Sequence, residues 1–529
     1  MRVDRGVERP VSSLKDPFLY AIIALGAVLI FWSLGERYLW QDEAETAMLA
    51  KSILRTGLPI AHDGKNVVSQ ELSREFGPDY MWRWSPWLQF YLAAGSFALF
   101  GPSTLSARLP FAVLGLSAVP LTYWLARRFM GCVNSARLSS LILATSVPFL
   151  LHTRQARWYA VTFVIVSFLF ICLEGIARGK KWACVGFAAS AALLFYANFF
   201  VAIGVLAVLL FAAPAYQYEK TFLWRLVVSY AFVLLGVLPG LLFFNSFDEG
   251  KQFDLERTTI LLTYYLGFLF TFLLPLPLAV ALVWFLFSKP RVTSLRPEWT
   301  RGARLLLIFC LSYPLYLSLG PWHMFRYLSV ILPLTSVLLG LVIFRIFEMN
   351  RYAGIAGLAI LIFTNILHVV PLGLIDAPGT ESTAGEVVSV GPFHSPLASY
   401  LYEITHATPE PEPVIVKYLK DNANPSDVVF ATYGDLPIQF YTDLRVLGTL
   451  QAQLVAAEPD WIIVRRTRNG IWMSGRDETL DQVLKGISLE KYHRTYLPCS
   501  DSVLGNCPEP PFHSFVLPGD VPSVLILYK

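Results

Sequence analysis

The sequence predicts a polytopic α-helical membrane protein that ends in a soluble α/β domain. Of its 529 residues, 55% are hydrophobic and only 15% are charged, whereas about a quarter are charged in an average soluble protein. Apolar runs long enough to cross a bilayer recur between Pro17 and Ile375, and the mean hydropathy is +0.53. The net charge of +4 is small and scattered, so we expect no nucleic-acid partner.

About eleven apolar segments are long enough to form transmembrane helices. They cover residues 17–34, 106–126, 135–152, 158–176, 182–196, 199–215, 222–245, 260–287, 303–319, 327–346 and 353–375. If the N-terminus is cytoplasmic, the segments on that side carry most of the Lys and Arg, including Arg127, Arg128 and Arg345. This bias follows the positive-inside rule, and an odd number of spans then places the C-terminus outside the membrane. We expect residues 1–375 to form the membrane domain.

One apolar run, from Pro86 to Gly101, does not fit as a span. Counting it would place the basic segment "ARRFMG" outside and remove the charge bias. We therefore expect a helix that lies in the outer membrane interface. The first outer loop then covers residues 35–106, which is long enough to build a site.

Three carboxylates lie just after the first span, in the stretch "YLWQDEAETA". Residues Asp42 to Arg55 have helical periodicity, and "TGLP" ends the helix at Gly57. In one interpretation, Asp42 is the N-cap, Glu45 completes a capping box, and Glu43 is a solvated first-turn acid. A cap accounts for one or two acids, and it does not explain why the polar end of the helix lies at the membrane face.

Further polar clusters lie at the outer ends of other spans. They include His152, Arg154, Gln155, Arg157, Trp158 and Tyr159 in "LLHTRQARWYA", Tyr196 and Asn198 in "FYANFF", and Trp322, His323, Arg326 and Tyr327 in "PWHMFRYL". Each residue alone is typical of an interfacial anchor or an aromatic belt. Several clusters on the same face as the three acids favour a functional site, because charge at a membrane is costly and is usually paired or functional.

The order of these motifs over residues 17–375 resembles that of GT-C glycosyltransferases. "QDEAETAMLAKSILRTGLP" resembles the first outer loop of bacterial glycosyltransferase family 39, with its protein O-mannosyltransferase and aminoarabinose transferase relatives, whose signature is an Asp-Glu pair after the first span. "WSPWLQFYLAAGSFALFGPSTLSARLPFAVLGL" is similar to the family's Pro-Pro-Leu interfacial helix followed by Arg-Leu-Pro, although Ser85-Pro86-Trp87 replaces Pro-Pro-Leu. "HTRQARWYA", "YANFF" and "FRYLSVILPL" resemble three further motifs, with Asn198 where His is usual.

This resemblance implies a GT-C type fold and a membrane glycosyltransferase. Such enzymes move a sugar from a polyprenyl-phosphate donor to a lipid, glycan or protein acceptor, here on the outer face of a bacterial or archaeal cytoplasmic membrane, by an inverting mechanism. The acceptor hydroxyl needs a base, for which we expect Asp42, with Glu43 supporting it or holding an optional Mg²⁺ or Mn²⁺ ion. The leaving phosphate needs fixed positive charge.

For the donor phosphate we expect Arg157 and Arg326, with His323 and Lys65. The expected substrate-binding residues are Trp82, Trp84, Tyr159 and Asn198. A tryptophan at a membrane interface is also typical of a simple anchor.

The composition changes after about Asp376, where charge and proline increase and the apolar runs shorten. "PVIVKYLKDNANPSDVVFATY" predicts a helix, a turn at Asn424-Pro425 and a strand, and "DWIIVRR" and "SVLILYK" predict further strands. We therefore expect residues 376–529 to form an extracytoplasmic α/β domain that binds the acceptor or caps the membrane domain. Cys499 and Cys507 are expected to form a local disulfide in the oxidising outer compartment.

Two other classes of function remain open at this level. A transporter or flippase for lipid-linked sugars would favour broken helices with charges at the membrane midplane. A polysaccharide polymerase or ligase would more typically place its large loop late in the chain. The polar clusters here lie at one face, and the two halves of the chain show no obvious inverted repeat.

Overall fold

The computed structural model describes most of the chain. The described residues are 16–244, 254–287, 297–320, 324–368, 393–407, 410–451, 459–467, 470–471, 488–501, 507–510, 513, 515 and 523–529. His323, one of the expected phosphate-binding residues, lies outside them.

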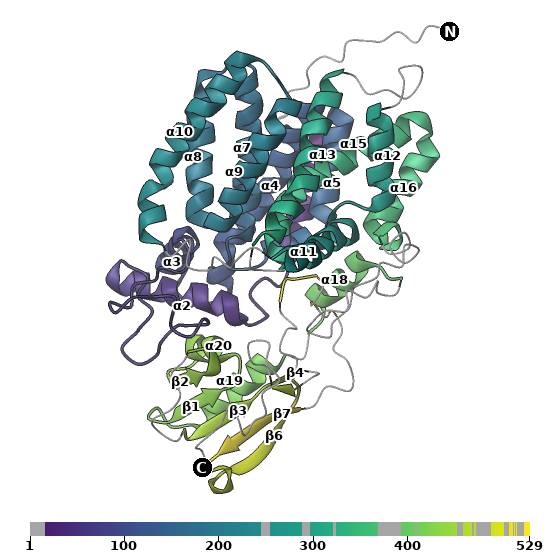
Figure 1. Cartoon of the computed structure of the whole chain (residues 1–529). Helices are drawn as coiled ribbons and strands as arrows, with labels where there is room; N and C mark the ends of the chain where they lie inside the picture. Colours follow the sequence, from purple (N-terminus) through teal and green to yellow (C-terminus); the bar gives the residue numbers. More distant parts are fainter. Residues whose placement is uncertain are drawn as a thin grey trace.

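A bundle of helices makes up the larger part of the molecule (Figure 1). Its helices are α1 (Pro17–Phe31), α4 (Thr104–Met130), α5 (Val133–Thr145), α6 (Val147–Thr153), α7 (Tyr159–Ala177), α8 (Lys181–Ala197), α9 (Phe199–Ala212), α10 (Lys220–Phe243), α11 (Leu255–Phe268), α12 (Leu276–Phe287), α13 (Pro297–Ser318), α14 (Phe325–Leu328), α15 (Leu332–Met349) and α16 (Arg351–Phe363). Each of the predicted spans therefore contains helix.

The structure supports the predicted number of spans only in part. Within the described residues, four helices are long and apolar enough to cross a membrane, or five if one bent pair is counted as a single span. The bent pair is α11 and α12, which meet at an angle of 88° within the predicted span 260–287. Pro275 and Pro277 lie at the bend, where they cannot donate the backbone hydrogen bonds that would continue a helix.

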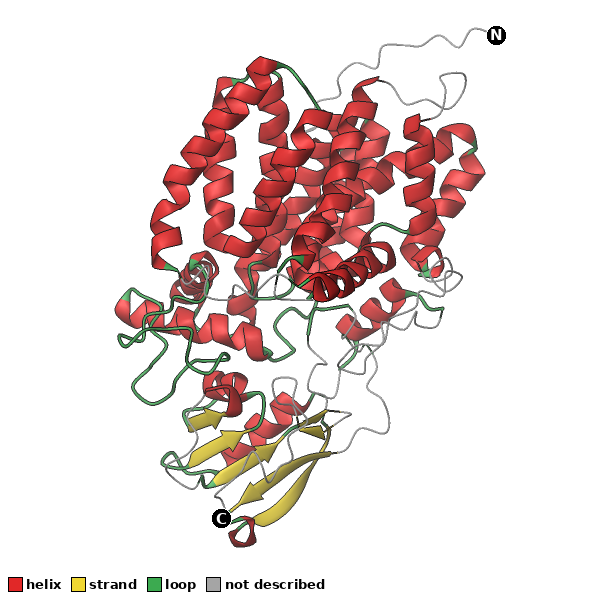
Figure 2. Ribbon diagram, viewed as in Figure 1, coloured by secondary structure: helices red, strands yellow, loops and turns green. Residues whose placement is uncertain are grey.

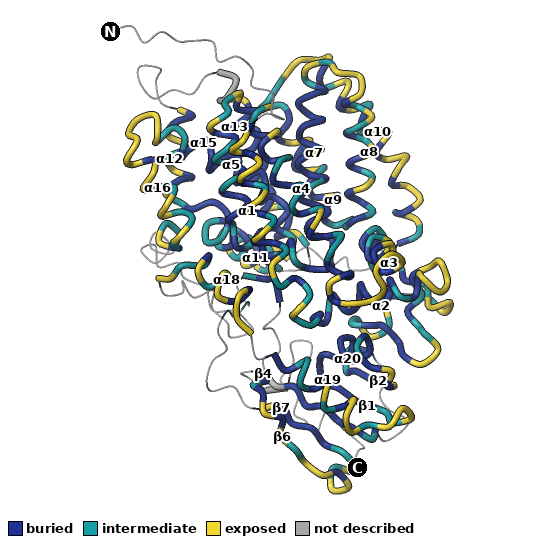
Figure 3. Tube along the Cα trace, turned by 180° about the vertical axis from the view of Figure 1, so that it is seen from behind, coloured by how far each residue is buried: buried dark blue, intermediate teal, exposed yellow. Residues whose placement is uncertain are grey.

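The outer helices of the bundle contain many exposed residues, whereas the inner ones are mostly buried (Figure 3). The spans at α7 and α14–α15 are 83% and 78% buried within the protein, whereas the span at α10 is only 28% buried. Helix α10 exposes Trp224, Leu235 and Leu242. Large apolar groups with no protein partner are suited to lipid, as expected of an integral membrane protein.

Two helices of the first outer loop lie at one end of the bundle, where α2 (Gln41–Thr56) runs across it and packs on α3 (Leu88–Phe100) (Figure 1). Helix α2 ends at Gly57, whose φ of 79° is the left-handed conformation expected there. The capping interpretation of its N-terminus is wrong, because Trp40 is the N-cap and no side chain bonds to the end of the helix. The run Pro86 to Gly101 forms a helix as expected, and its place in the interface stays a prediction.

The C-terminal part of the chain contains an α/β domain, as predicted (Figure 2). Its five-stranded sheet has the order β2-β1-β3-β7-β6, in which the first three strands are parallel and the last two are antiparallel to their neighbours. The strands are β1 (Val428–Ala431), β2 (Arg445–Gly448), β3 (Trp461–Val464), β6 (His493–Ser500) and β7 (Ser523–Tyr528), and a small hairpin joins β4 (Arg466–Thr467) to β5 (Gly470–Ile471). The described α-helices of this part of the chain are α18 (Pro396–Thr405), α19 (Pro411–Asn422) and α20 (Asp435–Tyr441).

The expected disulfide is not formed in this structure, where Cys499 and Cys507 are both free and buried. Cys499 belongs to strand β6 and packs in the core of the sheet with Leu497 and Val524. Cys507 lies instead within electrostatic reach of Arg326, at the end of the membrane bundle. The two sulfurs therefore lie in different environments. The boundary at residue 375 stays a prediction, since it lies outside the described residues.

The soluble domain is docked directly on the first outer loop. Gln41 donates to Asp435 over 2.7 Å, and Lys51 donates to the carbonyl of Phe440 over 2.9 Å. Lys65 donates to the backbone carbonyls of Pro425 and Asp443. Its ammonium therefore holds the domain in place, and the structure does not place it where we expected a donor phosphate.

The burial of Asp435 should make stability depend on pH. Burial raises the pKa of Asp435 to about 6, from an ordinary value of 3.8. Between these values the folded protein binds more protons at this group than the unfolded protein, so its stability should increase as the pH falls from about 6 toward 3.8. A protonated Asp435 would also gain one O–H donor, beside the side-chain oxygens of Gln41 and Gln451, which are buried without a partner among the described residues.

We expect Asp435→Asn to remove this pH dependence and to stabilise the protein at pH 7 by on the order of 3 kcal/mol, because the amide cannot ionise. The measurement is the melting temperature of the full-length protein in detergent between pH 4.5 and 7.5. Asp421→Asn, on the exposed face of α19, is the matched control and should keep the wild-type slope. Equal slopes for all three proteins would contradict this account.

Candidate active site

The centre of the candidate site is Asp42, in the first turn of α2. Its side chain is partly buried, and one of its carboxylate oxygens lies 2.5 Å from Arg326 and 3.8 Å from Arg157. Burial by itself would raise the pKa of Asp42, but the two arginines outweigh burial and the pKa lies below its ordinary value. Asp42 is therefore an ionised carboxylate at neutral pH.

The structure brings Arg157 and Arg326 together, although they come from distant parts of the chain. Arg157 lies in the turn before α7, and Arg326 lies in α14. Both guanidinium groups reach the same oxygen of Asp42. The Arg326 guanidinium also lies 5.7 Å from the ring of Trp40. This convergence is what a phosphate clamp requires, and the role of the arginines in binding a donor stays a prediction.

Glu45 is part of this cluster and does not cap the helix. Its carboxylate accepts from Arg157 over 2.7 Å and from the amide of Gln70 over 2.6 Å. Burial raises the pKa of Glu45, and Arg157 offsets this only in part while Asp42 adds to it. The surroundings therefore move the pKa values of Asp42 and Glu45 in opposite directions, which is typical of carboxylates with different roles.

Glu43 points away from the cluster and is completely buried. Its two oxygens accept from Arg108 over 2.8 and 2.6 Å, and one also accepts from the backbone N–H of Ala156 over 2.7 Å. Arg108 in addition donates to the carbonyls of Leu34 and Arg37. Glu43 supports Asp42 only indirectly, because it ties α2 to α4 and to the turn that carries Arg157.

The possible cation site on Asp42 and Glu43 finds no support in the structure, because the two carboxylates bind different arginines. Nor do the described residues contain a group of three or more His, Cys, Asp and Glu that could hold a metal ion.

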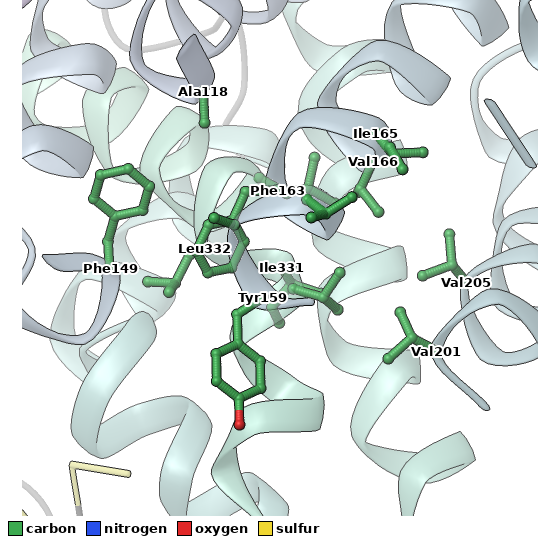
Figure 4. Packing of buried hydrophobic residues seen from close by; sticks show 14 of the residues in the cluster. Ala118, Phe149, Tyr159, Phe163, Ile165, Val166, Val201, Val205, Ile331 and Leu332 are labelled. Atoms are coloured by element: carbon green, nitrogen blue, oxygen red, sulfur yellow. The ribbon is translucent and has the colours of Figure 1, made fainter. Parts of the chain in front are cut away.

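Tyr159 lies beside the cluster and offers an unused donor. Its ring packs among apolar side chains, and its hydroxyl points away from them (Figure 4). The hydroxyl is buried and has no hydrogen-bond partner among the described residues, and the same is true of Nε of Arg157. Both groups lie near Asp42, within its electrostatic reach. Buried polar atoms usually have a hydrogen-bond partner, so these two donors beside Asp42 are suited to bind a polar group that enters the site.

The other expected substrate-binding residues have structural roles here. The indole of Trp82 is completely buried, where it donates to Ser85 over 3.0 Å and packs edge-on against Phe90. The ring of Trp84 lies 5.7 Å from the guanidinium of Arg74. Asn198 is the N-cap of α9, since its side chain accepts from the N–H of Val201 over 3.0 Å.

One residue of the site was missed by the sequence analysis. Glu509, from the C-terminal segment, is completely buried and accepts from Nε of Arg326 over 2.5 Å and from its backbone N–H over 3.0 Å. Its stretch "NCPEPPF" has no periodicity and no recognised motif. No signal in the sequence could have joined it to a helix 183 positions earlier.

The position of Glu43 predicts a loss of stability when its charge is removed. Glu43→Gln leaves Arg108 buried without its counter-charge, and breaking a buried pair in this way costs about 3–5 kcal/mol. We expect a clearly lower melting temperature and a lower yield of folded protein in detergent. Asp79→Asn is the control, because its carboxylate pairs with Arg83 at the surface, where water screens the pair, and its melting temperature should stay near that of the wild type. Lost activity at an unchanged melting temperature would mean that Glu43 takes a direct part in the chemistry.

Comparison with known proteins shows which fold this is. No family model matches the chain. An uncharacterized protein of Aquifex aeolicus (strain VF5) is 30% identical over 173 residues, which is 32% of this chain and about a third of that protein's length.

Two solved structures resemble most of the chain. ArnT from Cupriavidus metallidurans in the apo state matches 82% of this chain and 85% of its own, with a TM-score of 0.56 and 14% identity. The same protein bound to undecaprenyl phosphate matches 88% of this chain and 84% of its own, with a TM-score of 0.50 and 14% identity. This chain therefore shares its fold with the membrane protein ArnT.

Proposed function

We propose that this protein is a membrane glycosyltransferase that uses a polyprenyl-phosphate sugar donor. The observation that carries the proposal is the convergence of Arg157 and Arg326 on Asp42 at one end of the helical bundle. Fixed guanidinium groups suit a phosphate, and a carboxylate beside them suits an acceptor hydroxyl. The fold supports the proposal, since ArnT has been solved with undecaprenyl phosphate bound.

The reaction we propose is a single displacement at the anomeric carbon. The acceptor oxygen attacks that carbon while Asp42 takes its proton, and the bond between the carbon and the phosphate oxygen breaks. The polyprenyl phosphate leaves with the bonding electrons, and Arg157 and Arg326 stabilise its growing charge. This reaction needs one base and one leaving group. Because it is a single displacement, the configuration of the anomeric carbon is inverted.

The ion pairs of Asp42 suggest how the base is controlled. In this structure the two arginines keep the pKa of Asp42 low, which ensures that it is ionised but makes it a weak base. A donor phosphate would compete with Asp42 for both guanidinium groups. The pKa of Asp42 would then rise toward a value better suited to accept a proton. The free donors of Tyr159 and Arg157 could hold the sugar or the phosphate.

The finer assignments are also proposals. We assign the protein to glycosyltransferase family 39 because of its Asp-Glu pair and the order of its motifs. We place the site and the C-terminal domain on the outer face of the cytoplasmic membrane, where a lipid, glycan or protein is the acceptor. The break between α11 and α12 is a feature that transporters share. The residues of α11 and α12, however, are charged only at Glu256 and Arg257, near the start of α11. This position does not favour a transport path through the membrane midplane.

The assignment of the base predicts that Asp42→Asn reduces transfer by a factor of about 10² to 10⁴. The variant should still fold and bind the donor, because the amide keeps the shape of the side chain. The measurement is turnover of a lipid-linked sugar donor by the purified protein, with donor binding measured in parallel. The control is Asp79→Asn, which makes the same change at the surface of the first outer loop. A change at Glu45 would not serve as a control, because Glu45 binds Arg157. Near-normal turnover by Asp42→Asn would show that another group is the base.

The clamp hypothesis predicts a loss of donor affinity when either arginine is removed. A hydrogen bond to a charged group contributes about 1.5–3 kcal/mol, so Arg157→Ala and Arg326→Ala should each weaken donor binding roughly tenfold to a hundredfold. Arg→Lys should restore only part of the affinity, because lysine lacks the planar fork. The control is Arg74→Ala, which changes an exposed arginine of the first outer loop and should bind the donor like the wild type. Unchanged donor affinity in both alanine variants would reject the clamp.

A further inference from the structure

Glu509 is the point where the C-terminal domain enters the candidate site. From the sheet, the chain reaches the end of the bundle, where a short yellow stretch passes below α11 (Figure 1). There Glu509 is completely buried, and its carboxylate accepts from both the backbone N–H and the side-chain Nε of Arg326. This contact brings an acidic residue of the soluble domain to an arginine of the membrane domain.

The bonds of Glu509 determine how the Arg326 guanidinium is turned. Its Nε donates to Glu509, and its Nη1 donates to Asp42. Among the described residues, the hydrogen-bond contact of its Nη2 is a weak one with the sulfur of Met324, at 3.9 Å. A guanidinium is a rigid planar fork, so holding Nε at one edge fixes the direction of the two terminal nitrogens. The terminal nitrogens, of which Nη1 faces Asp42, are then the donors that a ligand could take.

The segment that carries Glu509 is itself tied down. The backbone N–H of His513 donates to the carbonyl of Glu509 over 2.8 Å, and Nδ1 of His513 donates to the carbonyl of Cys507 over 2.8 Å. Nε2 of His513 lies 2.6 Å from a carboxylate oxygen of Glu403, which also pairs with Arg37. Glu509 is thus anchored to α18 and, through Glu403, to the first outer loop.

These contacts separate two possible roles for Glu509. A carboxylate that only occupies an empty phosphate site would have to leave when the donor binds. An anchored carboxylate on the Nε side, away from Asp42, can stay in place while the phosphate takes the terminal nitrogens. The anchoring through His513 and the second bond to the backbone of Arg326 favour the second role.

We propose that Glu509 is a positioning residue that orients Arg326 for the phosphate of the lipid-linked donor, so that the C-terminal domain completes the donor site. This inference rests on the proposed function, since it assumes that Arg326 binds that phosphate. It gives the soluble domain a task in donor binding, besides any role as a cap or in binding the acceptor.

The test is the binding of undecaprenyl phosphate, without sugar, to the full-length protein in detergent. Glu509→Gln keeps the shape of the side chain but removes the charge that holds Nε of Arg326. We expect affinity to fall about tenfold or more, and the donor KM to rise by a larger factor than kcat falls. Glu490→Gln, an exposed acid of the same domain, should behave like the wild type.

A double-mutant cycle shows whether Glu509 acts through Arg326. In an Arg326→Ala background, Glu509→Gln should cost less than about twofold, because the group that it orients is absent. If Glu509→Gln does not yield folded protein, Glu509→Asp keeps the charge, shortens the reach, and should weaken binding by a smaller factor.

Unchanged or tighter binding by Glu509→Gln would overturn the proposal, and tighter binding would mean that the phosphate displaces this carboxylate. An equal loss in the Arg326→Ala background would overturn it too, because the effect would then come from general packing. If the wild-type protein itself does not bind undecaprenyl phosphate, the proposed function fails, and this inference fails with it.

Discussion

The guanidinium of Arg326 is the interaction on which the arrangement of the whole molecule depends. It joins Asp42, 284 positions earlier in the first outer loop, to Glu509, 183 positions later in the C-terminal segment. A buried charge without a partner costs several kcal/mol, so these three segments have to pack together or leave ions stranded in a medium of low dielectric. The site therefore exists only where the bundle, the loop and the soluble domain meet.

The geometry of one helix separates the three acids that follow the first span. Neighbouring residues on an α-helix point about 100° apart, whereas residues three positions apart share a face. Asp42 and Glu45 therefore both reach Arg157, and Glu43 turns away to Arg108. One short acidic stretch thus supplies both the carboxylates of the candidate site and a structural ion pair.

Electrostatics gives the two carboxylates of the cluster different properties. Asp42 faces two guanidinium groups and keeps a low pKa, while Glu45 is more deeply buried, has only one such partner, and its pKa is raised. The same cations that hold Asp42 ionised are suited to a phosphate. In the proposed reaction their charge would be shared between a base and a leaving group, which would couple donor binding to the basicity of Asp42.

The sequence by itself determined the helical membrane class, the α/β character of the C-terminal part, and the candidates Asp42, Arg157 and Arg326. These follow from hydropathy, from local periodicity and from the position of charge at span ends, which are all local properties. Only the tertiary structure decided that Glu43 pairs with Arg108, that Lys65 and Asn198 have structural roles, that Cys499 and Cys507 lie in different environments, and that Glu509 joins the site. The direction of a side chain and its partner across more than a hundred positions depend on packing, which no local pattern encodes.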